Sequence, residues 1–413
     1  MKFILIYIYM SVNTLINGPI NVVRLEGHVN NIKKIIYLFL DYHQNIHYQT
    51  KCPSFTSLDL YQYLAINLKN SSFPIDFMFE ITQQNLSGLS YEYKDIYIRE
   101  VVDFFRTEFY NDKSKNNNLI RYHFIDVRDY IFDTIFYYDH VLSDIFHYSN
   151  TNNNIHSHDV NNIKHYINLI LHELDYWELL LFGDFKDINK LTKQNLERLS
   201  KDKQYDTKQV TENIKQVPNF IYKIRERYNN KQVRDNLQNI FDYIYDQFTQ
   251  VIDLCTSIVN DLESNKDNFT NDFTLTYSKC LKIYVWKNLA CDHIDLIKTI
   301  IKKYLILSHT ILSLFSNIMD IYFLRRFLDK DYIQHAVVYT GAAHSVNYAQ
   351  HLITKYNFKI THVSYSLEKD LTKLNEKLKK FDDTTDRREY EKNLYPVKLL
   401  QCSDLSHFPK NFE

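Results

Sequence analysis

Short apolar runs along this chain predict the strands of a buried sheet. Positions 20–26 alternate between apolar and polar residues, and positions 34–40 are almost continuously apolar, with an Asn-Asn pair between the two runs. This pattern predicts a β-hairpin whose second strand is buried on both faces. Two later apolar runs, at 74–81 and 120–128, predict two more buried strands.

Segments with helical periodicity separate these strands. Apolar residues recur at three- and four-residue spacing in 58–68 and in 95–109, and the Ser/Thr-rich residues 54–57 favour a helix start. Strands that alternate with helices imply parallel strand–helix–strand units. Beyond the third strand the pattern changes, and amphipathic segments follow one another at 129–148, 162–181, 208–228, 232–264 and 276–328.

A last strand–helix–strand unit is predicted near the C-terminal end. A β-branched run that ends at Thr340 predicts a buried strand, and it leads into three small residues and a histidine, Gly341-Ala342-Ala343-His344. A helix is predicted over 345–356 and a strand over 358–365. Ligands of such units bind beyond the carboxyl ends of the strands, which is where we expect His344.

Together these elements predict an α/β protein with a mainly parallel sheet core, flanking helices and a large all-helical insertion. The first part of the core is predicted over 18–128, the insertion over 129–330, and the last part of the core with its tail over 331–413. Within the tail we expect a charged helix over 371–381 and an apolar segment at 394–400 that docks on the edge of the core.

The predicted core strands all end in ionisable or small residues. A charge left unpaired at the edge of a core is costly, and a shared polar pocket would explain why several strands end this way. Because the carboxyl ends of parallel strands lie on one edge of a sheet, we expect these groups to converge although they are far apart in sequence. The residues concerned are Asp41, His43, Glu80, Asp126, Arg128, Gly341 and His344.

Two kinds of chemistry suit this set. A divalent metal such as Zn, Mn or Fe takes oxygen and nitrogen ligands, and the candidate ligands are Asp41, His43, Glu80 and His344. General acid–base catalysis needs no metal, and the candidate catalytic residues are Glu80, His344, Asp126 and Arg128. In either case the guanidinium of Arg128 suits a substrate carboxylate or phosphate.

Each candidate also has a structural interpretation. A histidine after a strand is commonly a structural residue with satisfied hydrogen bonds, and Asp41 suits a turn position. Glu80 suits a helix cap or an ion pair with a lysine, and Asp126 and Arg128 suit an ion pair with each other. No GxSxG, P-loop or GxGxxG motif occurs, which leaves serine-hydrolase and ordinary nucleotide-binding functions without support.

Charge and composition narrow the function classes. With 49 basic and 50 acidic residues the chain carries no overall positive charge, so no nucleic-acid partner is expected. Only five glycines occur, so each one is more significant than in an average protein. The most apolar long segment, 304–319, is too short for a transmembrane helix and predicts a buried helix instead.

Cysteine spacing and the N-terminal residues bear on the compartment. The five cysteines are scattered, odd in number and without a CxxC pair, which predicts buried thiols in a reduced intracellular protein. The apolar run at 3–10 is like a short signal core, but no small-x-small cleavage site follows it, so no signal peptide is expected.

Several of these residues resemble motifs of uncharacterised proteins of large DNA viruses. In that group a helix with aspartate, tyrosine, arginine and phenylalanine precedes a strand that ends in a Gly-Asp-Ala-His-like motif. The matching residues here are Asp320, Tyr322, Arg326, Phe327, Gly341, Ala343 and His344. Ala342 stands where the group often has aspartate, whereas Arg24-Leu25-Glu26-Gly27 and Leu40-Asp41-Tyr42-His43 also fit. The resemblance implies a giant-virus protein in the host cytoplasm or the virion.

More distantly, the chain is similar to the superfamily of erythromycin-esterase-like, ChaN-like haem-binding and TraB/Tiki proteins. That superfamily has an α/β core with helical insertions, an early strand that ends in a His or Glu motif, and a late Gly-x-x-His that matches Gly341 and His344. Its members include hydrolases and metal-dependent proteases, so the resemblance implies a hydrolase-like core. The early Gly-x-x-His is not intact here, because Leu40 stands in place of the glycine before His43.

Two functions follow from these observations. The first is a metal-dependent hydrolase that acts on a small-molecule or peptide substrate, with the helical insertion covering the pocket. The alternative is a non-catalytic binding or virion-associated protein with an eroded site. Ala342 favours this alternative, and so does the tyrosine-rich helical region, which suits a protein partner.

Overall fold

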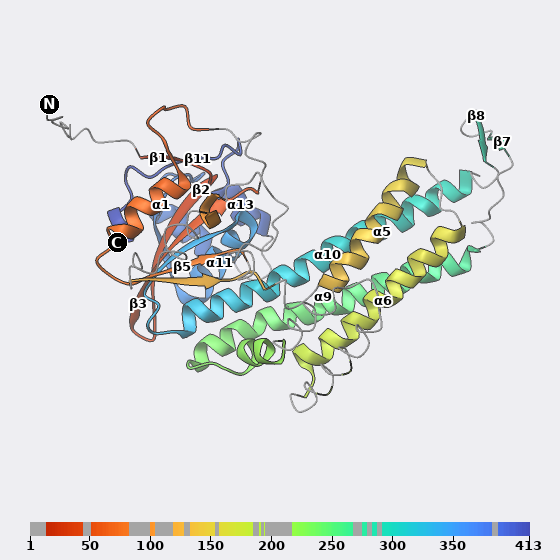
Figure 1. Cartoon of the computed structure of the whole chain (residues 1–413), viewed down its shortest axis with the longest axis horizontal. Helices are drawn as coiled ribbons and strands as arrows, with labels where there is room; N and C mark the ends of the chain where they lie inside the picture. The colour runs from red at the N-terminus through yellow and green to blue at the C-terminus, as the bar shows by residue number, and fades with distance from the viewer. Residues whose placement is uncertain are drawn as a thin grey trace. The chain divides into compact units, whose positions relative to one another are not determined.

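The computed structural model describes two compact units. The first unit comprises 1–126 and 322–413, and the second comprises 127–321. Figure 1 labels many of their helices and strands, and α10 (Cys291–Asp329) contributes residues to each unit. The described residues are 14–43, 51–81, 100–103, 119–127, 133–152, 157–184, 190, 194, 217–266, 275–278, 283–286, 291–381 and 387–413.

A six-stranded sheet forms the centre of the first unit (Figure 1). Its strands, in spatial order, are β10 (Lys359–Val363), β2 (Asn21–Val29), β3 (Ile32–Asp41), β9 (His335–Gly341), β5 (Ile75–Phe79) and β6 (Ile120–Phe124). The pairs β3–β9, β9–β5 and β5–β6 are parallel, whereas β2 is antiparallel to both of its neighbours. The predicted α/β class with a mainly parallel sheet is therefore confirmed.

The predicted hairpin at the start of the sheet is confirmed as β2 and β3. Asn30 and Asn31 form its two-residue turn with φ angles of 50° and 64°. Two consecutive positive φ angles are typical of the hairpin turn that asparagine tolerates and most other residues do not. The late unit is also present, but its helix α11 (Ala342–Tyr356) begins earlier than predicted, so His344 lies in the first helical turn.

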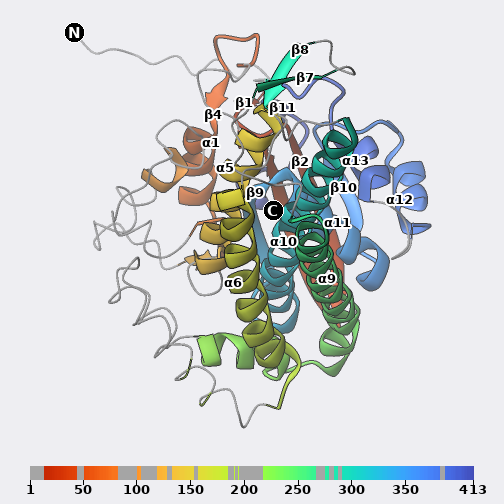
Figure 2. The ribbon, with the colours of Figure 1, turned by 90° about the vertical axis from the view of Figure 1, so that its right-hand side faces the viewer.

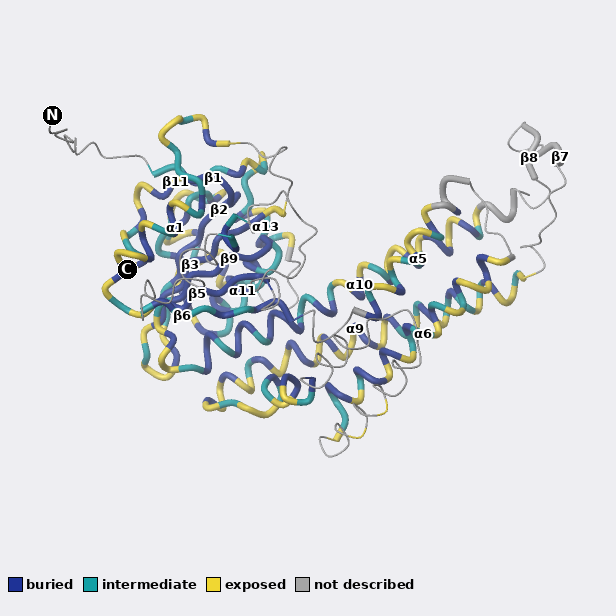
Figure 3. Tube along the Cα trace, viewed as in Figure 1, coloured by how far each residue is buried: buried dark blue, intermediate teal, exposed yellow. Residues whose placement is uncertain are grey.

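Helices and the C-terminal segment cover the two faces of the sheet. On one face alternate strand residues, among them Tyr37, Phe39 and Phe79, pack with α1 (Leu60–Lys69) and with Phe412 near the C-terminal end. The other face is covered by α11, which contacts β2, β3 and β9. Figure 3 shows the strands between these layers as the buried part of the unit.

A small second sheet joins distant parts of the first unit. It contains β11 (Cys402–Asp404), β1 (Leu15–Asn17) and β4 (Leu58–Asp59) in that order. Cys402 of β11 forms a disulfide with Cys52, which lies 350 residues earlier in the chain. The expectation of thiols is therefore wrong for these two cysteines, while Cys255 is a buried free thiol.

The tail of the first unit differs from its prediction in one respect. A helix forms where the charged segment predicted one, as α12 (Leu371–Lys379), and α13 (Arg387–Leu394) follows. The apolar segment at 394–400 forms no strand, and the strand that docks is β11 just beyond it. The segment contains Pro396, which cannot donate a backbone hydrogen bond to a neighbouring strand.

The described part of the second unit is mainly helical. Its long helices are α5 (Asp133–Asn152), α6 (Ser157–Phe182), α9 (Lys231–Ser264) and the first part of α10, and Figure 2 shows α6, α9 and α10 running alongside one another. Residues 217–225 are also helical. The prediction of helix from 276 is wrong at its start, because β7 (Leu275–Ser278) and β8 (Ile283–Trp286) pair as a hairpin. Their β-branched and aromatic residues favour strand.

One described helix is apolar and long enough to cross a membrane by length and composition. This segment is Asp295–Asp329 of α10, with a mean hydropathy of 1.3 in its most apolar window. The expectation that no segment is long and apolar enough for a transmembrane helix is therefore wrong as far as length and composition go. Within the protein 56% of that window is buried, which agrees with the predicted buried helix.

Lys34 is a fully buried lysine that caps the end of α10. Its Nζ donates hydrogen bonds to the main-chain oxygens of Phe327, Lys330 and Ile333 at 3.0, 2.8 and 2.6 Å. The last carbonyls of a helix have no partner within the helix and carry partial negative charge, so an ammonium group satisfies both needs.

Replacing this lysine is expected to destabilise the protein. Lys34→Met removes a donor from three main-chain oxygens, of which that of Lys330 still accepts from the N–H of Ile333. The free energy of unfolding should therefore fall by about 3 kcal/mol in urea denaturation. The matched control is Lys33→Met, because the Lys33 side chain is 55% exposed and pairs with Glu26 at the surface. That change should cost less than about 1 kcal/mol. Equal losses in the two variants would contradict the capping role.

Candidate functional site

The parallel register brings three strand ends together. Asp41 is the last residue of β3 and pairs with Gly341, the last residue of β9. Glu80 follows β5 directly, and its main-chain N–H donates to the carbonyl oxygen of Tyr339 at 3.1 Å. Asp41, Glu80 and Gly341 therefore lie on the same edge of the sheet, as expected for the carboxyl ends of parallel strands.

His43 connects two of these strand ends. It adopts a left-handed backbone conformation with φ of 45°, two residues beyond β3. Its Nδ1 lies 2.6 Å from Oδ2 of Asp41, and its main-chain N–H donates to the same oxygen at 3.3 Å. The other ring nitrogen, Nε2, lies 3.4 Å from Oε2 of Glu80. The buried carboxylate of Asp41 thus orients the ring of His43 toward Glu80.

The carboxylate of Glu80 lies between two histidines and a helix end. Its Oε2 accepts a hydrogen bond from the N–H of Gly341 at 2.6 Å, and Gly341 is the N-cap of α11. Nε2 of His344 lies 3.7 Å from its other oxygen, Oε1. A helix N-terminus favours a nearby anion, so the helix-cap interpretation of Glu80 also holds. We call Asp41, His43, Glu80 and His344 the edge cluster.

Because Gly341 has no side chain, it leaves space for two side chains of the edge cluster. A Cβ atom at this position would lie 2.9 Å from Nε2 of His43 and 3.3 Å from Oε2 of Glu80. Both distances are shorter than ordinary van der Waals contact. A glycine therefore stands here because two polar side chains approach its Cα closely.

Burial and charge act in opposite directions on the edge cluster. Burial by itself lowers the pKa of His43, but hydrogen bonds to Asp41 and Glu80 outweigh it and raise the pKa to about 10. Burial would raise the pKa of Glu80, but the charge of His344 and the hydrogen bond from His43 lower it to about 2. At neutral pH the ring of His43 is therefore a cation and Glu80 an anion.

Two further predicted catalytic residues are Asp126 and Arg128. Asp126 is buried just beyond β6, where the N–H of Ile125 donates to the carbonyl oxygen of Phe79 at 3.2 Å. Arg128 lies outside the described residues. In the described part of the chain no group of three or more His, Cys, Asp or Glu side chains is arranged to hold a metal ion. The four predicted metal ligands come together, but they contact one another directly.

A second polar network was not anticipated from the sequence. Asp76, fully buried within β5, accepts hydrogen bonds from Nε and Nη2 of Arg121 at 2.8 and 2.5 Å, and its Oδ1 lies 2.6 Å from Nε2 of His123. Nδ1 of His123 accepts a hydrogen bond from Nε of Arg326 at 2.8 Å. Burial lowers the pKa of His123, which suits this acceptor role. The available signal was a charged residue inside the apolar run at 74–81.

Comparison with known proteins finds a family that covers nearly the whole chain. A family of unknown function, DUF5847, matches residues 14–413. The chain belongs to this family. An uncharacterized protein of Acanthamoeba polyphaga mimivirus is 30% identical over 97% of each chain, and a second from the same virus is 28% identical over 96% of this chain and 98% of its own. No solved structure matches.

These comparisons support the coarser of the two resemblances. The likeness to uncharacterised proteins of giant viruses is confirmed by the mimivirus relatives of this DUF5847 protein. Both relatives align along almost their full length, so the edge cluster and the second unit both fall within the matched region.

A methyl group at Gly341 is expected to destabilise the edge cluster. Gly341→Ala forces His43 and Glu80 to move, and the free energy of unfolding should fall by about 1–3 kcal/mol in urea denaturation. In a His43→Ala background the nearest atom is gone, so the same substitution should cost clearly less. Additive losses in the double variant would show that the two positions are not in contact.

The stability contribution of His43 is expected to depend on pH. Its pKa is about 10 in the folded protein and 6.5 ordinarily, so its contribution is complete below pH 6.5 and is lost as pH rises through 10. The pKa of Glu80 is about 2 in the folded protein and 4.5 ordinarily. Its contribution to stability is therefore complete above pH 4.5 and is lost as pH falls through 2.

Urea denaturation of the wild type and of His43→Gln between about pH 5.5 and pH 10 measures this contribution. The difference in unfolding free energy should be largest at the acid end of this range and shrink steadily toward the alkaline end. The His43 side chain is 41% exposed, so solvent screening keeps the difference small. A difference that stays constant across the range would contradict the cationic state of His43.

Proposed function

We propose that the edge cluster is the functional site of this giant-virus protein and that it serves a hydrolase-like reaction on a small-molecule or peptide substrate. The observation that carries the proposal is the approach of two histidines, His43 and His344, to one buried carboxylate, Glu80, at 3.4 and 3.7 Å. The cluster lies at the edge of the sheet where α/β proteins bind ligands. Perturbed pKa values of clustered groups are also typical of functional sites.

Each member of the edge cluster has a chemical role in this proposal. Asp41 holds the ring of His43 in one orientation, and the imidazolium donates a hydrogen bond to the oxygen that gains negative charge. Glu80 takes a proton from the attacking water as general base, and His344, whose Nε2 lies 3.7 Å from Oε1 of Glu80, gives a proton to the leaving group. The distances to Glu80 are long for hydrogen bonds, and such contacts commonly tighten when substrate binds. Asp126, which is buried just beyond the neighbouring strand β6, is the next candidate for a catalytic residue.

Asp41 offers an additional site for a ligand. Its Oδ2 contacts His43, whereas its Oδ1 is buried and has no hydrogen-bond partner among the described residues. A buried acceptor without a donor costs stability, and natural proteins tolerate such costs mainly at functional sites. A hydroxyl or amine group of a substrate would supply the missing donor.

A divalent metal fits this arrangement less well than acid–base chemistry. The oxygen and nitrogen atoms of the four predicted ligands suit Zn, Mn or Fe, and these side chains do gather at one place. In the described part of the chain, however, no three of them are arranged around a common ion position. His43 instead bridges Asp41 and Glu80 directly. The proposed reaction therefore depends on the side chains alone.

A non-catalytic binding protein of the virion or host cytoplasm is the second candidate. The pKa values of His43 and Glu80 lie far on either side of neutrality, whereas an efficient general acid or base has a pKa near the working pH. The second unit exposes apolar side chains, among them Leu305, Leu312 and Tyr243, at 61, 54 and 54%. Such side chains suit a protein partner.

Activity measurements separate the two candidates. The full-length protein is assayed against panels of esters, peptides and phosphoesters, with and without a chelator. Glu80→Gln and His344→Ala should each lower turnover by on the order of 10²–10⁴, the usual contribution of one acid–base group. His140→Ala, at an exposed position of the second unit, is the matched control and should keep full activity. Turnover that survives both substitutions would show that the edge cluster is not the catalytic site, and no turnover at all would favour the binding protein. Loss of turnover with the chelator would support a metal-dependent reaction instead.

A further inference from the structure

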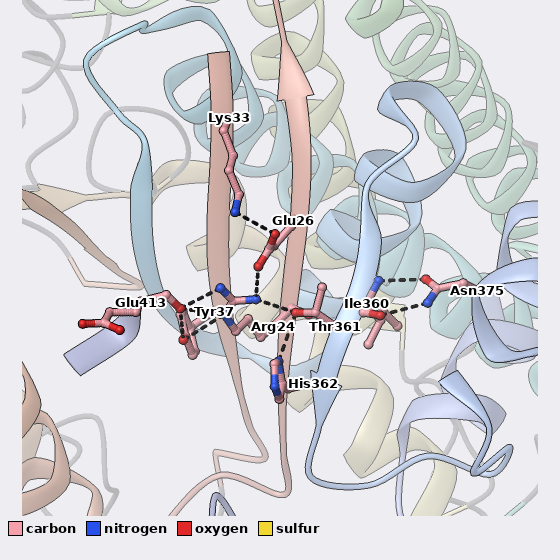
Figure 4. Close-up of polar contacts among 9 residues, drawn as sticks. All are labelled: Arg24, Glu26, Lys33, Tyr37, Ile360, Thr361, His362, Asn375 and Glu413. Carbon is pink, nitrogen blue, oxygen red and sulfur yellow. Dashed lines mark hydrogen bonds and ion pairs between the residues drawn. The ribbon is translucent and has the colours of Figure 1, made fainter. Parts of the chain in front are cut away.

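The side chain of Arg24 forms a binding site for a main-chain oxygen, that of Glu413 (Figure 4). Its Nε and Nη2 donate to the main-chain oxygen of Glu413 at 2.9 and 2.6 Å, and the hydroxyl of Tyr37 donates to the same oxygen at 2.8 Å. Nη1 donates to Oγ1 of Thr361 at 2.6 Å and to Glu26. Three donors from two strands thus converge on one oxygen atom.

The site is built of buried groups whose charges are balanced. The side chain of Arg24 is only 4% exposed, and a guanidinium in such a place needs nearby acceptors to offset its lost hydration. Glu26 supplies negative charge and also pairs with Lys33 at 3.0 Å. Burial raises the pKa of Tyr37 to about 12, so its hydroxyl keeps the proton that it donates. The guanidinium of Arg24 and the hydroxyl of Tyr37 are therefore both available as hydrogen-bond donors.

The segment that fills this site has an unusual backbone conformation. Asn411 and Phe412 have φ angles of 56° and 64°, in the left-handed region that a bulky residue such as phenylalanine rarely adopts. The N–H of Asn411 donates to Oδ1 of Asn67 at 2.9 Å. The ring of Phe412 packs edge-on against the rings of Tyr37 and Tyr63, with distances of 5.1 and 5.9 Å between ring centroids. Strain of this kind persists only where the surroundings determine the conformation.

We propose that Arg24, Tyr37 and Thr361 form a peptide-recognition site, and that Leu405–Glu413 of the same chain is its resident ligand. The site recognises an aromatic side chain followed by a main-chain oxygen, a combination that peptide-binding sites use for anchoring and orientation. The disulfide of Cys402 lies just before this segment, so the resident ligand is held at high effective concentration. A second peptide can therefore enter only when the resident one is weakened.

A labelled peptide in trans tests the proposal. The probe is a fluorescein-labelled synthetic peptide with the sequence of residues 405–413, added to full-length proteins and followed by fluorescence anisotropy. The wild type should not bind it, whereas Phe412→Ala, which weakens the resident segment, should. Adding Arg24→Gln to Phe412→Ala should weaken peptide binding at least tenfold, whereas the matched addition of Arg234→Gln, at an exposed position of the second unit, should not. Absence of binding to Phe412→Ala, or equal binding with Arg24→Gln, would overturn the proposal.

A second measurement keeps the test decisive if Phe412→Ala does not fold. Tyr37→Phe removes one of the three donors and keeps the aromatic ring, so the fold should survive. Amide hydrogen exchange at Asn411, Phe412 and Glu413 should then accelerate about tenfold while exchange in β9 is unchanged. Unchanged exchange in the three residues would show that the donors do not hold the segment and would overturn the proposal.

Discussion

The pairing of β3 with β9 and of β9 with β5 is the constraint on which the candidate site depends. It places Asp41 opposite Gly341, and it brings the N–H of Glu80 to the carbonyl oxygen of Tyr339. Once these strands are in register, the carboxylate of Glu80 accepts from the N–H of Gly341, the N-cap of α11, and His344 follows in the first turn of that helix. The chemistry of the edge cluster is thus a consequence of sheet geometry together with one glycine.

Buried charges elsewhere in the first unit perform a related task. Lys34 joins β3 to the end of α10, Arg24 joins β2 to the C-terminal segment, and Asp76 joins β5 to β6. Each charge lies on a strand, and each finds partners on a segment distant in sequence. Because a buried charge without partners is costly, such residues specify which segments dock on the sheet.

Local patterns account for much of this fold. The hairpin of β2 and β3, the buried runs that became β5 and β9, and the helix α11 all follow from periodicity and turn residues. The features that were missed depend on contacts that periodicity does not report. The hairpin of β7 and β8 lies in a stretch whose periodicity predicts a helix. The disulfide joins two cysteines that are 350 residues apart. From the sequence alone Asp76 is a charged residue within an apolar run, and only the structure shows that His123 lies beside it.

The sequence by itself determined most strands of the six-stranded sheet and that its parallel strands end in polar or small residues, because the alternation of side chains and the cost of burying a charge are local properties. It also determined that a glycine precedes His344. Only the tertiary structure decided that His43 bridges Asp41 and Glu80 instead of pointing to solvent, and that Arg24 binds the main-chain oxygen of Glu413. Those contacts depend on strand order and on the docking of distant segments, which many different folds with the same local pattern would arrange differently.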